Sequence, residues 1–529
     1  MVIGLTDRLF GSLSTTGPVI PADEADSIDD LTVSLLLDPN SIHLADGTPR
    51  TFSLVVTPEQ RFPTVEVAMW AVTGGDLDSQ RRIGLHFMRG GRSVGFAWRR
   101  VVVVDSEADR PYAQRPEPPQ DLLDLAALTD EQPPDLVLAL YRGDDRSART
   151  FIWDALATSD TLDVPDTQRT CAFDDDAGAD FAARVRRIVK NNNLAPMPMF
   201  AELAGFGEEI GRVIPSGIAR VLRTLAAEGA GGTAASVLVL TEEAFVPWEL
   251  AVLPGAPLDP AYGGSSPFLG AHLAMSRWPL VPGKPRPTPQ PTHTITTQAV
   301  LSAKYDGVAN WPKLPEAEGE AEKLSTEYPP MHRIPPLWDE VKRCLEGSPR
   351  VDWLHVALHG QFDPQGADDG VVLLQGDPPN LTQQFLTPRQ VTSFRMPYRP
   401  FVFLNACQVG AGNQELGSYA GMAVALLKAG ACAVVAAQWN VDDVVAAGIS
   451  NRFYAKVFAD PPVPVAEALR QIRAEYTEDR VRLDPAHAQP TLLAYQLLGH
   501  PRLLLSRRRL PERPSLFDPL EELRGREEP

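Results

Sequence analysis

The sequence is poor in cysteine and has no long apolar run. Four cysteines, Cys171, Cys344, Cys407 and Cys432, stand among 529 residues, and no two form a Cys-x-x-Cys pair. We therefore expect neither a disulfide framework nor a zinc site, and a reducing compartment fits best. No stretch reaches the roughly 18 apolar residues of a membrane span, and no basic stretch precedes an apolar core at the amino terminus. These features predict a cytoplasmic protein that does not enter a membrane.

Positive charge is also scarce. The chain has 49 Lys and Arg against 68 Asp and Glu, which gives a formal net charge of −19. An acidic surface repels phosphate groups, so neither nucleic acid nor an anionic membrane is an expected partner.

Proline, in contrast, is in excess. It accounts for 50 of the 529 residues, about twice the usual share. The prolines cluster at 106–120 and 279–292, where they disfavour helices and central strands. We interpret the first cluster as a linker between two domains and the second as an exposed loop inside the second domain.

The rest of the chain divides by its pattern. Residues 1–30 are polar and end in an acidic run, which is typical of a flexible lead-in, and the charged residues 506–529 are typical of a disordered tail. Short β-rich runs separated by turn signals over 31–105 predict a small all-β, sandwich-like domain. This segment has no cluster of His, Cys or carboxylates, so we interpret it as an interaction module.

Residues 121–505 alternate between apolar runs and amphipathic segments. Buried strands are expected at 351–358, 401–405 and 431–438, among others, with helices between them. This alternation predicts an α/β fold with a mostly parallel sheet and helices on both faces.

Two of these strands end in reactive side chains. His359 and Gly360 follow one apolar run, and Cys407 follows the next and precedes a Gly-rich loop. Functional groups gather at the carboxyl ends of parallel strands. The 48 positions between His359 and Cys407 match the arrangement of caspase-type cysteine peptidases, whose His lies about 50 residues upstream.

The pairing has a chemical reason. A free thiol is mostly protonated at neutral pH, and a neighbouring imidazole accepts its proton and later protonates the leaving amine. The amides of Gly360 and Cys407 would donate to the oxyanion. Each residue also has a structural interpretation, because a Cys after a β run is most often a buried small hydrophobe. We interpret His355, in the middle of its strand, and Cys432, inside an apolar strand, as packing residues.

Several motifs occur in a characteristic order: VLVLTEEAFVPWELAVLP (237–254), HVALHG (355–360), FLNACQVGAGN (403–413) and GMAVALLKAGACAVVAAQWNVDD (421–443). Together they resemble the CHAT family, caspase-like cysteine proteases of clan CD that are related to separase and often associated with tetratricopeptide repeats. The resemblance implies that His359 is the general base and acid, that Cys407 is the nucleophile, and that Gly360 and Cys407 supply the oxyanion donors. It also implies a caspase-like sheet. No tetratricopeptide repeats precede this region, and the β module stands in their place.

The resemblance extends to a substrate pocket. Loops at these strand ends shape the pocket in the caspase-like clan, which implies substrate-binding roles for Asn440, Asp442 and Asp443. An acidic Asp443 would favour a basic side chain. The alternative is that Asp443 caps the helix that follows it.

We therefore expect a CHAT-type cysteine endopeptidase that cleaves a protein partner and needs neither a metal nor an organic cofactor. Family analogy suggests a regulated effector of prokaryotic signalling or anti-phage defence, activated by a protein partner or a co-encoded component. Two alternatives remain open. One is a catalytically silent scaffold that binds partners through its β module, and the other is a transferase that uses the same Cys–His pair.

Overall fold

The structure is a computed structural model. It describes residues 2–4, 28–57, 59–60, 63–72, 80–90, 92–104, 133–144, 150–157, 162, 164, 169–172, 177–190, 194–228, 234–243, 246–255, 258, 266–280, 289–305, 311, 313–361, 371–374, 384–406, 413–415, 418–439 and 441–508. The predicted linker at 106–120 lies outside this part of the chain.

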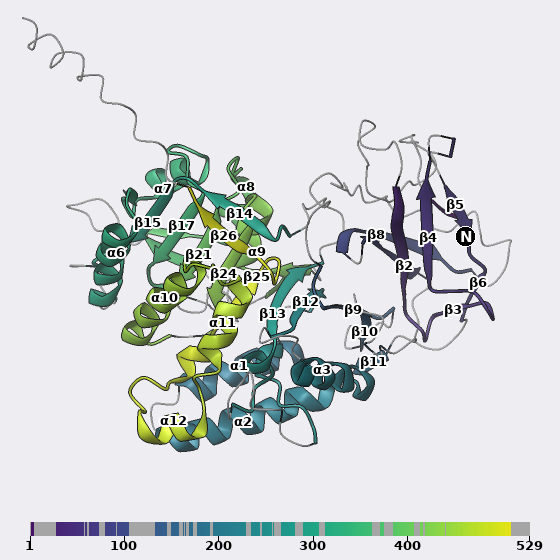
Figure 1. The fold of residues 1–529 in the computed structure, drawn as a ribbon, viewed down its shortest axis with the longest axis horizontal. Coiled ribbons are helices and arrows are strands. Elements are labelled where there is room, and N and C mark those ends of the chain that lie inside the picture. Colours follow the sequence, from purple (N-terminus) through teal and green to yellow (C-terminus); the bar gives the residue numbers. More distant parts are fainter. Residues whose placement is uncertain are drawn as a thin grey trace, which may run out of the picture.

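An eleven-stranded sheet forms the body of the protein (Figure 1). Its strand order is β11-β10-β9-β12-β13-β25-β24-β21-β17-β15-β16. The bounds are β9 Leu136–Arg142, β10 Thr150–Ala157, β11 Arg169–Ala172, β12 Ser236–Thr241, β13 Ala274–Pro279, β15 Gln298–Ser302, β16 Met331–Ile334, β17 Trp353–Ala357, β21 Phe401–Asn405, β24 Ala433–Ala437 and β25 Tyr495–Leu498.

Nine of the eleven strands form two parallel blocks of opposite direction, and β10 pairs antiparallel with both β9 and β11 at one end of the sheet. Strands β9, β12, β13 and β25 are parallel neighbours, and so are β24, β21, β17, β15 and β16. Strand β25 joins the blocks because it pairs antiparallel with β24. The carboxyl ends of β24, β21, β17 and β15 therefore meet at one edge of the sheet.

Helices and two apolar cores cover the sheet. Strands β17, β21 and β24 are buried along their whole length, which explains their unbroken apolar sequences. One core contains side chains from α1 Ala177–Lys190, α2 Pro196–Val213, α3 Ser216–Glu228, α6 Pro315–Glu327, α10 Asp443–Val457, α11 Val465–Arg473 and α12 Glu478–Leu483. The core on the other face contains side chains from α7 Trp338–Leu345, α8 Pro388–Ser393 and α9 Met422–Ala429. The short elements are α5 Leu269–His272, η4 Trp248–Leu250 and η5 Pro490–Leu493.

An antiparallel β region precedes the body. Its four-stranded sheet has the order β4-β2-β7-β8, and two further pairs are β3-β6 and β1-β5. The bounds are β1 Val2–Gly4, β2 Ile28–Leu37, β3 Ile42–Leu44, β4 Thr51–Val56, β5 Thr64–Glu66, β6 Met69–Ala71, β7 Gln80–Arg89 and β8 Arg92–Val102. The predicted fold class, an α/β sheet preceded by an all-β region, is confirmed. The predicted lead-in is structured at both of its ends, because β1 pairs with β5 and β2 begins at Ile28.

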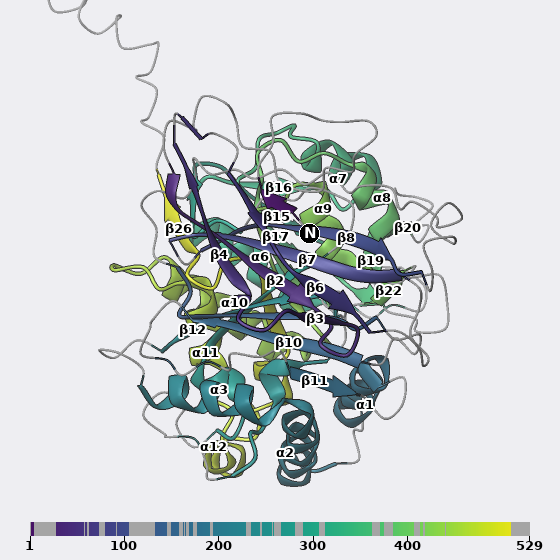
Figure 2. The same ribbon diagram turned by 90° about the vertical axis from the view of Figure 1, so that its right-hand side faces the viewer.

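The four-stranded sheet packs directly on the body, and Figure 2 shows it in front of the body strands. Alternate β2 residues form the sheet's own core, whereas Leu36 joins the apolar core of the body. The hydroxyl of Tyr141 donates to the Leu37 carbonyl at 3.1 Å. Arg82 donates twice to the Glu242 carboxylate, at 2.9 and 2.5 Å. The β region thus covers the face of β9, β10 and β12 that lies opposite α1, α2 and α3.

The predicted loop at 279–292 is shorter in the structure. Strand β13 extends to Pro279, and Thr292 begins β14 Thr292–Ile295, which pairs with β26 Leu504–Arg507. Residues 281–288 lie outside the described residues, as does the tail from 509 onward. Within the described ranges, no helix is both long and apolar enough to span a bilayer.

Candidate active site

Strands β17 and β21 precede His359 and Cys407 in the chain and are parallel neighbours. Their register pairs Ala357 with Asn405, and every pair of the ladder differs by the same 405 − 357 = 48 positions. His359 and Cys407 are also 407 − 359 = 48 positions apart. The sequence spacing of the predicted dyad therefore equals the register of the two strands.

Two aromatic rings hold the imidazole of His359, which is half-buried just beyond β17. The ring centroid of Tyr305 lies 4.6 Å from that of His359, and the centroid of Trp311 lies 5.1 Å away. Both aromatic residues follow β15, the strand beside β17. These contacts restrict the positions that the imidazole can take at the strand end.

The hydroxyl of Tyr305 also holds the backbone of His359. It accepts a hydrogen bond from the His359 amide at 2.9 Å and donates to the Leu373 carbonyl at 2.7 Å. The Leu373 amide donates to the His359 carbonyl at 2.9 Å. In an antiparallel ladder the His359 amide would donate directly to the Leu373 carbonyl. The Tyr305 hydroxyl bridges these two groups instead. Burial raises the pKa of Tyr305, so the hydroxyl keeps the proton that it donates.

The amide of Gly360 is directed away from its paired strand. Gly360 begins β18 Gly360–Gln361, which pairs antiparallel with β19 Val371–Leu374, and β20 Gln384–Leu386 completes this small sheet. Paired residues alternate between hydrogen-bonded and non-hydrogen-bonded positions in such a ladder. Because His359 and Leu373 occupy a hydrogen-bonded position, Gly360 and Val372 occupy the other kind. This orientation suits an oxyanion donor.

Two of the predicted site residues, Cys407 and Asn440, lie outside the described residues. The structure describes the chain on the amino side of Cys407 as far as Ala406, which is buried. On the carboxyl side of Asn440 it resumes at Val441.

Asp442 and Asp443 begin helix α10 and differ in their roles. Asp442 is the N-cap, and its Oδ1 accepts a hydrogen bond from the Val445 amide at 3.0 Å. The predicted alternative that Asp443 caps this helix is therefore wrong, because Asp443 is the first helical residue. Its Oδ2 instead accepts from the amide of Glu316, in the first turn of α6, at 3.3 Å. Asp443 thus links the amino termini of two helices.

The carboxyl group of Asp443 titrates near neutral pH. Burial raises its pKa to about 6, and the nearby carboxylates of Glu316, Glu320 and Asp442 contribute to the rise against the hydrogen bond from Glu316. Three further acidic side chains thus surround a half-buried carboxyl group. Such a cluster favours the approach of a cation.

Two of the other cysteines are unsuited to nucleophilic chemistry. Burial raises the pKa of the Cys344 thiol to about 11 and that of Cys432 to about 12. At neutral pH both thiols are almost entirely protonated, and the thiolate is the reactive form. Cys432 packs in the apolar core. The structural role predicted for it is confirmed.

A buried polar network lies behind the ends of β17 and β21. Glu320 of α6 is 3% exposed, and both of its carboxylate oxygens accept from the Asn405 amide group, at 3.1 and 2.9 Å. The hydroxyl of Ser450 donates to the same carboxylate. His355 Nε2 lies 3.1 Å from Glu320 Oε1, close enough for an ion pair but without the alignment of a hydrogen bond.

The sequence did not single out Tyr305, Trp311 or Glu320. The two aromatic residues follow an expected strand, so the strand-end rule that identified His359 could also have found them. Glu320 gives no such signal, because it is one of several carboxylates in a polar helix. Its inward direction depends on how α6 packs on the sheet.

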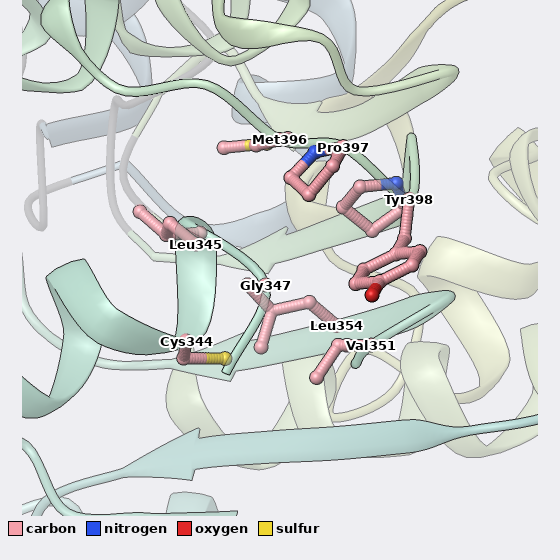
Figure 3. Close-up of a pocket in the computed structure, with 9 residues that line it drawn as sticks. Cys344, Leu345, Gly347, Val351, Leu354, Met396, Pro397 and Tyr398 are labelled. Atoms are coloured by element: carbon pink, nitrogen blue, oxygen red, sulfur yellow. The ribbon is translucent and has the colours of Figure 1, made fainter. Parts of the chain in front are cut away.

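The structure also has a pocket far from this edge, which Figure 3 shows. It lies where β17 and β21 begin, between the end of α7 and the loop before β21, and its lining includes Cys344, Leu354 and Tyr398. The strands separate this pocket from His359. Its lining is almost entirely apolar, and the protonated Cys344 thiol gives it no catalytic group.

The fold and site define an α/β protein with two neighbouring parallel strands, β17 and β21. In the sequence, His359 follows the first of these strands and Cys407 follows the second. Residues 245–499 match the family model of the CHAT domain. The chain therefore carries a CHAT domain over these residues, as the sequence motifs predicted. No curated protein matches the sequence.

Solved structures show a weaker likeness. The Arg-specific cysteine proteinase gingipain R is 13% identical, and the match covers 56% of this chain and 70% of that chain with a TM-score of 0.35. The Saccharomyces cerevisiae separase–securin complex is 9% identical, with 70% of this chain and 30% of that chain covered and a TM-score of 0.42. A complex of Porphyromonas gingivalis RgpB pro- and mature domains is 14% identical, and the match covers 56% of this chain and 72% of that chain with a TM-score of 0.35.

Proposed function

We propose that this protein is a cysteine endopeptidase of the CHAT type, with Cys407 as nucleophile and His359 as general base and acid. One observation carries the proposal: the separation of His359 and Cys407 equals the register of β17 and β21. Side chains that follow two paired parallel strands at the same register are neighbours at the sheet edge. The CHAT domain at 245–499 supports the same assignment.

The reaction follows from these roles. His359 accepts the thiol proton of Cys407, and the thiolate attacks the scissile carbonyl carbon to form a C–S bond. The amides of Gly360 and Cys407 donate to the oxyanion. The C–N bond breaks as His359 returns the proton to the leaving amine, and a water deprotonated by His359 hydrolyses the thioester. Tyr305 and Trp311 keep the imidazole in place through both steps.

The substrate in this proposal is another protein, and the protease is a regulated effector of prokaryotic signalling or anti-phage defence. A protein partner or a co-encoded component activates it in the cytoplasm. The CHAT domain supports this setting by family analogy. The packing of the β region on the body supports its participation in activation, because a partner bound to that region would act on β9, β10 and β12 directly.

Cleavage of a peptide library by the full chain tests the proposal. We expect the wild type, with candidate activating partners added, to cut a subset of peptides that Cys407→Ala leaves intact. Cys344→Ala serves as the control, because it removes a thiol that lies far from the predicted dyad. A wild type that cuts no peptide and whose Cys407 reacts no faster than a free thiol would favour the silent scaffold. A product that carries an acyl acceptor other than water would identify a transferase.

The substrate pocket of the proposal contains Asp443, Asp442 and Asn440. Ionised Asp443 attracts an Arg or Lys side chain, and this attraction is lost when the carboxyl group is protonated. Because the pKa of Asp443 is about 6, the preference for an Arg over a Gln peptide should rise as the pH increases from 5 to 7. We expect about a tenfold change in the ratio of kcat/KM values, on the order of one charged hydrogen bond.

An Asp443→Asn variant should show no such change with pH. Asp479→Asn is the matched control, since it removes the same charge from the first turn of another helix, α12, outside the proposed pocket. If Asp443→Asn kept the wild-type preference at pH 7, Asp443 would not belong to the pocket.

A further inference from the structure

A buried network joins the two strands that lead to the predicted dyad. Asn405 ends β21, and its side chain is held from two sides. Its amide nitrogen donates to both oxygens of Glu320, at 3.1 and 2.9 Å, and its Oδ1 accepts from the hydroxyl of Tyr495 at 2.5 Å. Glu320, Asn405 and Tyr495 come from α6, β21 and β25. All three are less than one-tenth exposed.

The network continues into β17 through Trp353 and His355. The Trp353 indole, which can only donate, gives a hydrogen bond to the Tyr454 hydroxyl at 3.0 Å. The Tyr454 hydroxyl also lies within hydrogen-bond distance of His355 Nδ1, at 2.9 Å, and burial raises the pKa of Tyr454 well above the usual range, so this hydroxyl stays protonated. The other ring nitrogen of His355, Nε2, faces Glu320 Oε1 at 3.1 Å. Glu320 therefore collects contacts from both strands.

We propose that Glu320, Asn405 and Tyr495 are positioning residues for the dyad. They fix the last residue of β21, two positions before Cys407, relative to β17 and hence to His359. The inference rests on the proposed function, because it assigns these residues to the same dyad. Such a role requires a fixed geometry, and the carboxylate provides it. Its two oxygens accept from Asn405, and Ser450 and His355 approach Oε1.

The location of the network favours this role over general stabilisation. His355 lies four residues before His359 in the sequence and pairs with Phe403, whereas Asn405 ends β21 two residues before Cys407 and pairs with Ala357. His355 and Ala357 share one face of β17, so His355 and Asn405 lie on the same face of the sheet. The remaining side chains on that face of the two strands are apolar. A polar cluster is costly to bury and is therefore unusual as simple core packing. Its polar atoms are concentrated where the strands approach the dyad.

The reactivity of Cys407 tests the proposal without a known substrate. The rate of alkylation by iodoacetamide is measured on the full chain from pH 5 to 10, with the modified peptide quantified by mass spectrometry. If His359 stabilises the thiolate, the wild-type profile should have an apparent pKa below that of a free thiol, about 8.5, and His359→Ala should move it to that value.

Tyr495→Phe is the most informative variant because it removes one hydroxyl and changes no charge. We expect its pH profile of alkylation to move toward that of His359→Ala. A rise of about half a unit in the apparent pKa of the thiol would lower the alkylation rate at pH 7 at least about threefold below wild type. Tyr476→Phe is the matched control: Tyr476 is equally buried but lies outside the network. It should retain the wild-type profile.

An exchange of donor and acceptor tests the Glu320–Asn405 pair. Glu320→Gln places an amide against an amide, and Asn405→Asp places a carboxylate against a carboxylate, so each single variant should lose at least about tenfold in rate, the equivalent of one hydrogen bond. The double variant restores an amide–carboxylate pair and the net charge, and should return to within about threefold of wild type. Loss of a negative charge alone would lower the pKa of the thiol. A rise in the apparent pKa of the Cys407 thiol in Glu320→Gln would therefore report a change in the position of the dyad.

The outcomes separate the two proposals. Identical profiles for wild type and His359→Ala would overturn the proposed function and this inference with it. A His359-dependent wild type whose profile persists in folded Tyr495→Phe and in the single variants would overturn the inference alone. If the single variants fail to fold, Tyr495→Phe and the double variant decide, because both retain the charge and the packing of the network.

Discussion

Acid is expected to destabilise the wild-type protein more than a His86→Phe variant. The difference in the free energy of unfolding should be about 2 kcal/mol at pH 5 and about 3 kcal/mol at pH 4. His86 lies in β7 and is fully buried, with no hydrogen-bond partner for either ring nitrogen among the described residues. It stacks on Phe96 of β8 at 4.3 Å. Burial lowers its pKa to about 3.

The direction follows from proton binding. In the unfolded chain His86 takes up a proton near its usual pKa of about 6.5, whereas in the folded protein it remains neutral down to about pH 3. Between these values the unfolded state binds more protons, so the free energy of unfolding falls as the pH falls. Phenylalanine removes the proton uptake and retains the stacking.

Urea unfolding between pH 4 and 7.5 measures this difference. His43→Phe is the matched control, because His43 belongs to the same β region but is exposed on β3. Its curve should follow that of wild type. Parallel pH curves for wild type and His86→Phe would contradict the prediction and would show that acid acts on other groups.

The β region shows what sequence patterns do and do not reveal. Alternation of apolar residues in β2 and β4 identified an antiparallel sheet, because one face must be buried. The same pattern gave no sign that the other face of this sheet packs on the body of the protein. Leu36, Arg82 and His86 lie on the other face of that sheet, and their burial depends on β9, β10 and β12, which are far away in the sequence. Packing between distant segments leaves no local periodicity.

The body follows the same rule. Its central strands were predicted because helices on both faces demand unbroken apolar runs, and His359 was identified because parallel strands end at one edge. The position of β25 between β13 and β24 was not predictable, since it is set by pairing across more than 50 residues of chain. Glu320 was missed for a related reason. Only the packing of α6 decides which of its carboxylates is buried.

Replacing Glu249 with glutamine is expected to lower the free energy of unfolding by about 3–5 kcal/mol, the range for breaking a buried ion pair. Glu249 lies in η4 and pairs with Arg277 of β13, and both side chains are 2% exposed. Arg277 Nε donates to Glu249 Oε1 at 3.1 Å. Burial opposes the ionisation of Glu249, but the attraction of Arg277 and Arg473 holds its pKa below the usual range. Glutamine would remove the counter-charge that Glu249 provides to Arg277 and Arg473.

Arg473 connects this ion pair to the candidate site. Its Nη2 donates to the Tyr495 carbonyl at 2.6 Å, and the Tyr495 hydroxyl donates to Asn405. Burial lowers the pKa of Arg473 to about 10, and Glu249 counteracts this effect. The contacts therefore run from the front half of the sheet through β25 to the end of β21. Glu249→Gln should also slow the alkylation of Cys407 under conditions where the variant is folded.

Chemical unfolding of Glu249→Gln beside Glu208→Gln measures the effect. Glu208 pairs with Arg212 on the surface of α2, with side chains 56% and 65% exposed, and its loss should cost no more than about 0.5 kcal/mol. Because both variants replace one glutamate and break one ion pair, the difference between them isolates burial. Equal costs would mean that water reaches Glu249. The front half of the sheet would then be held to the site by apolar packing and backbone pairing alone, and Cys407 reactivity should be the same in both variants.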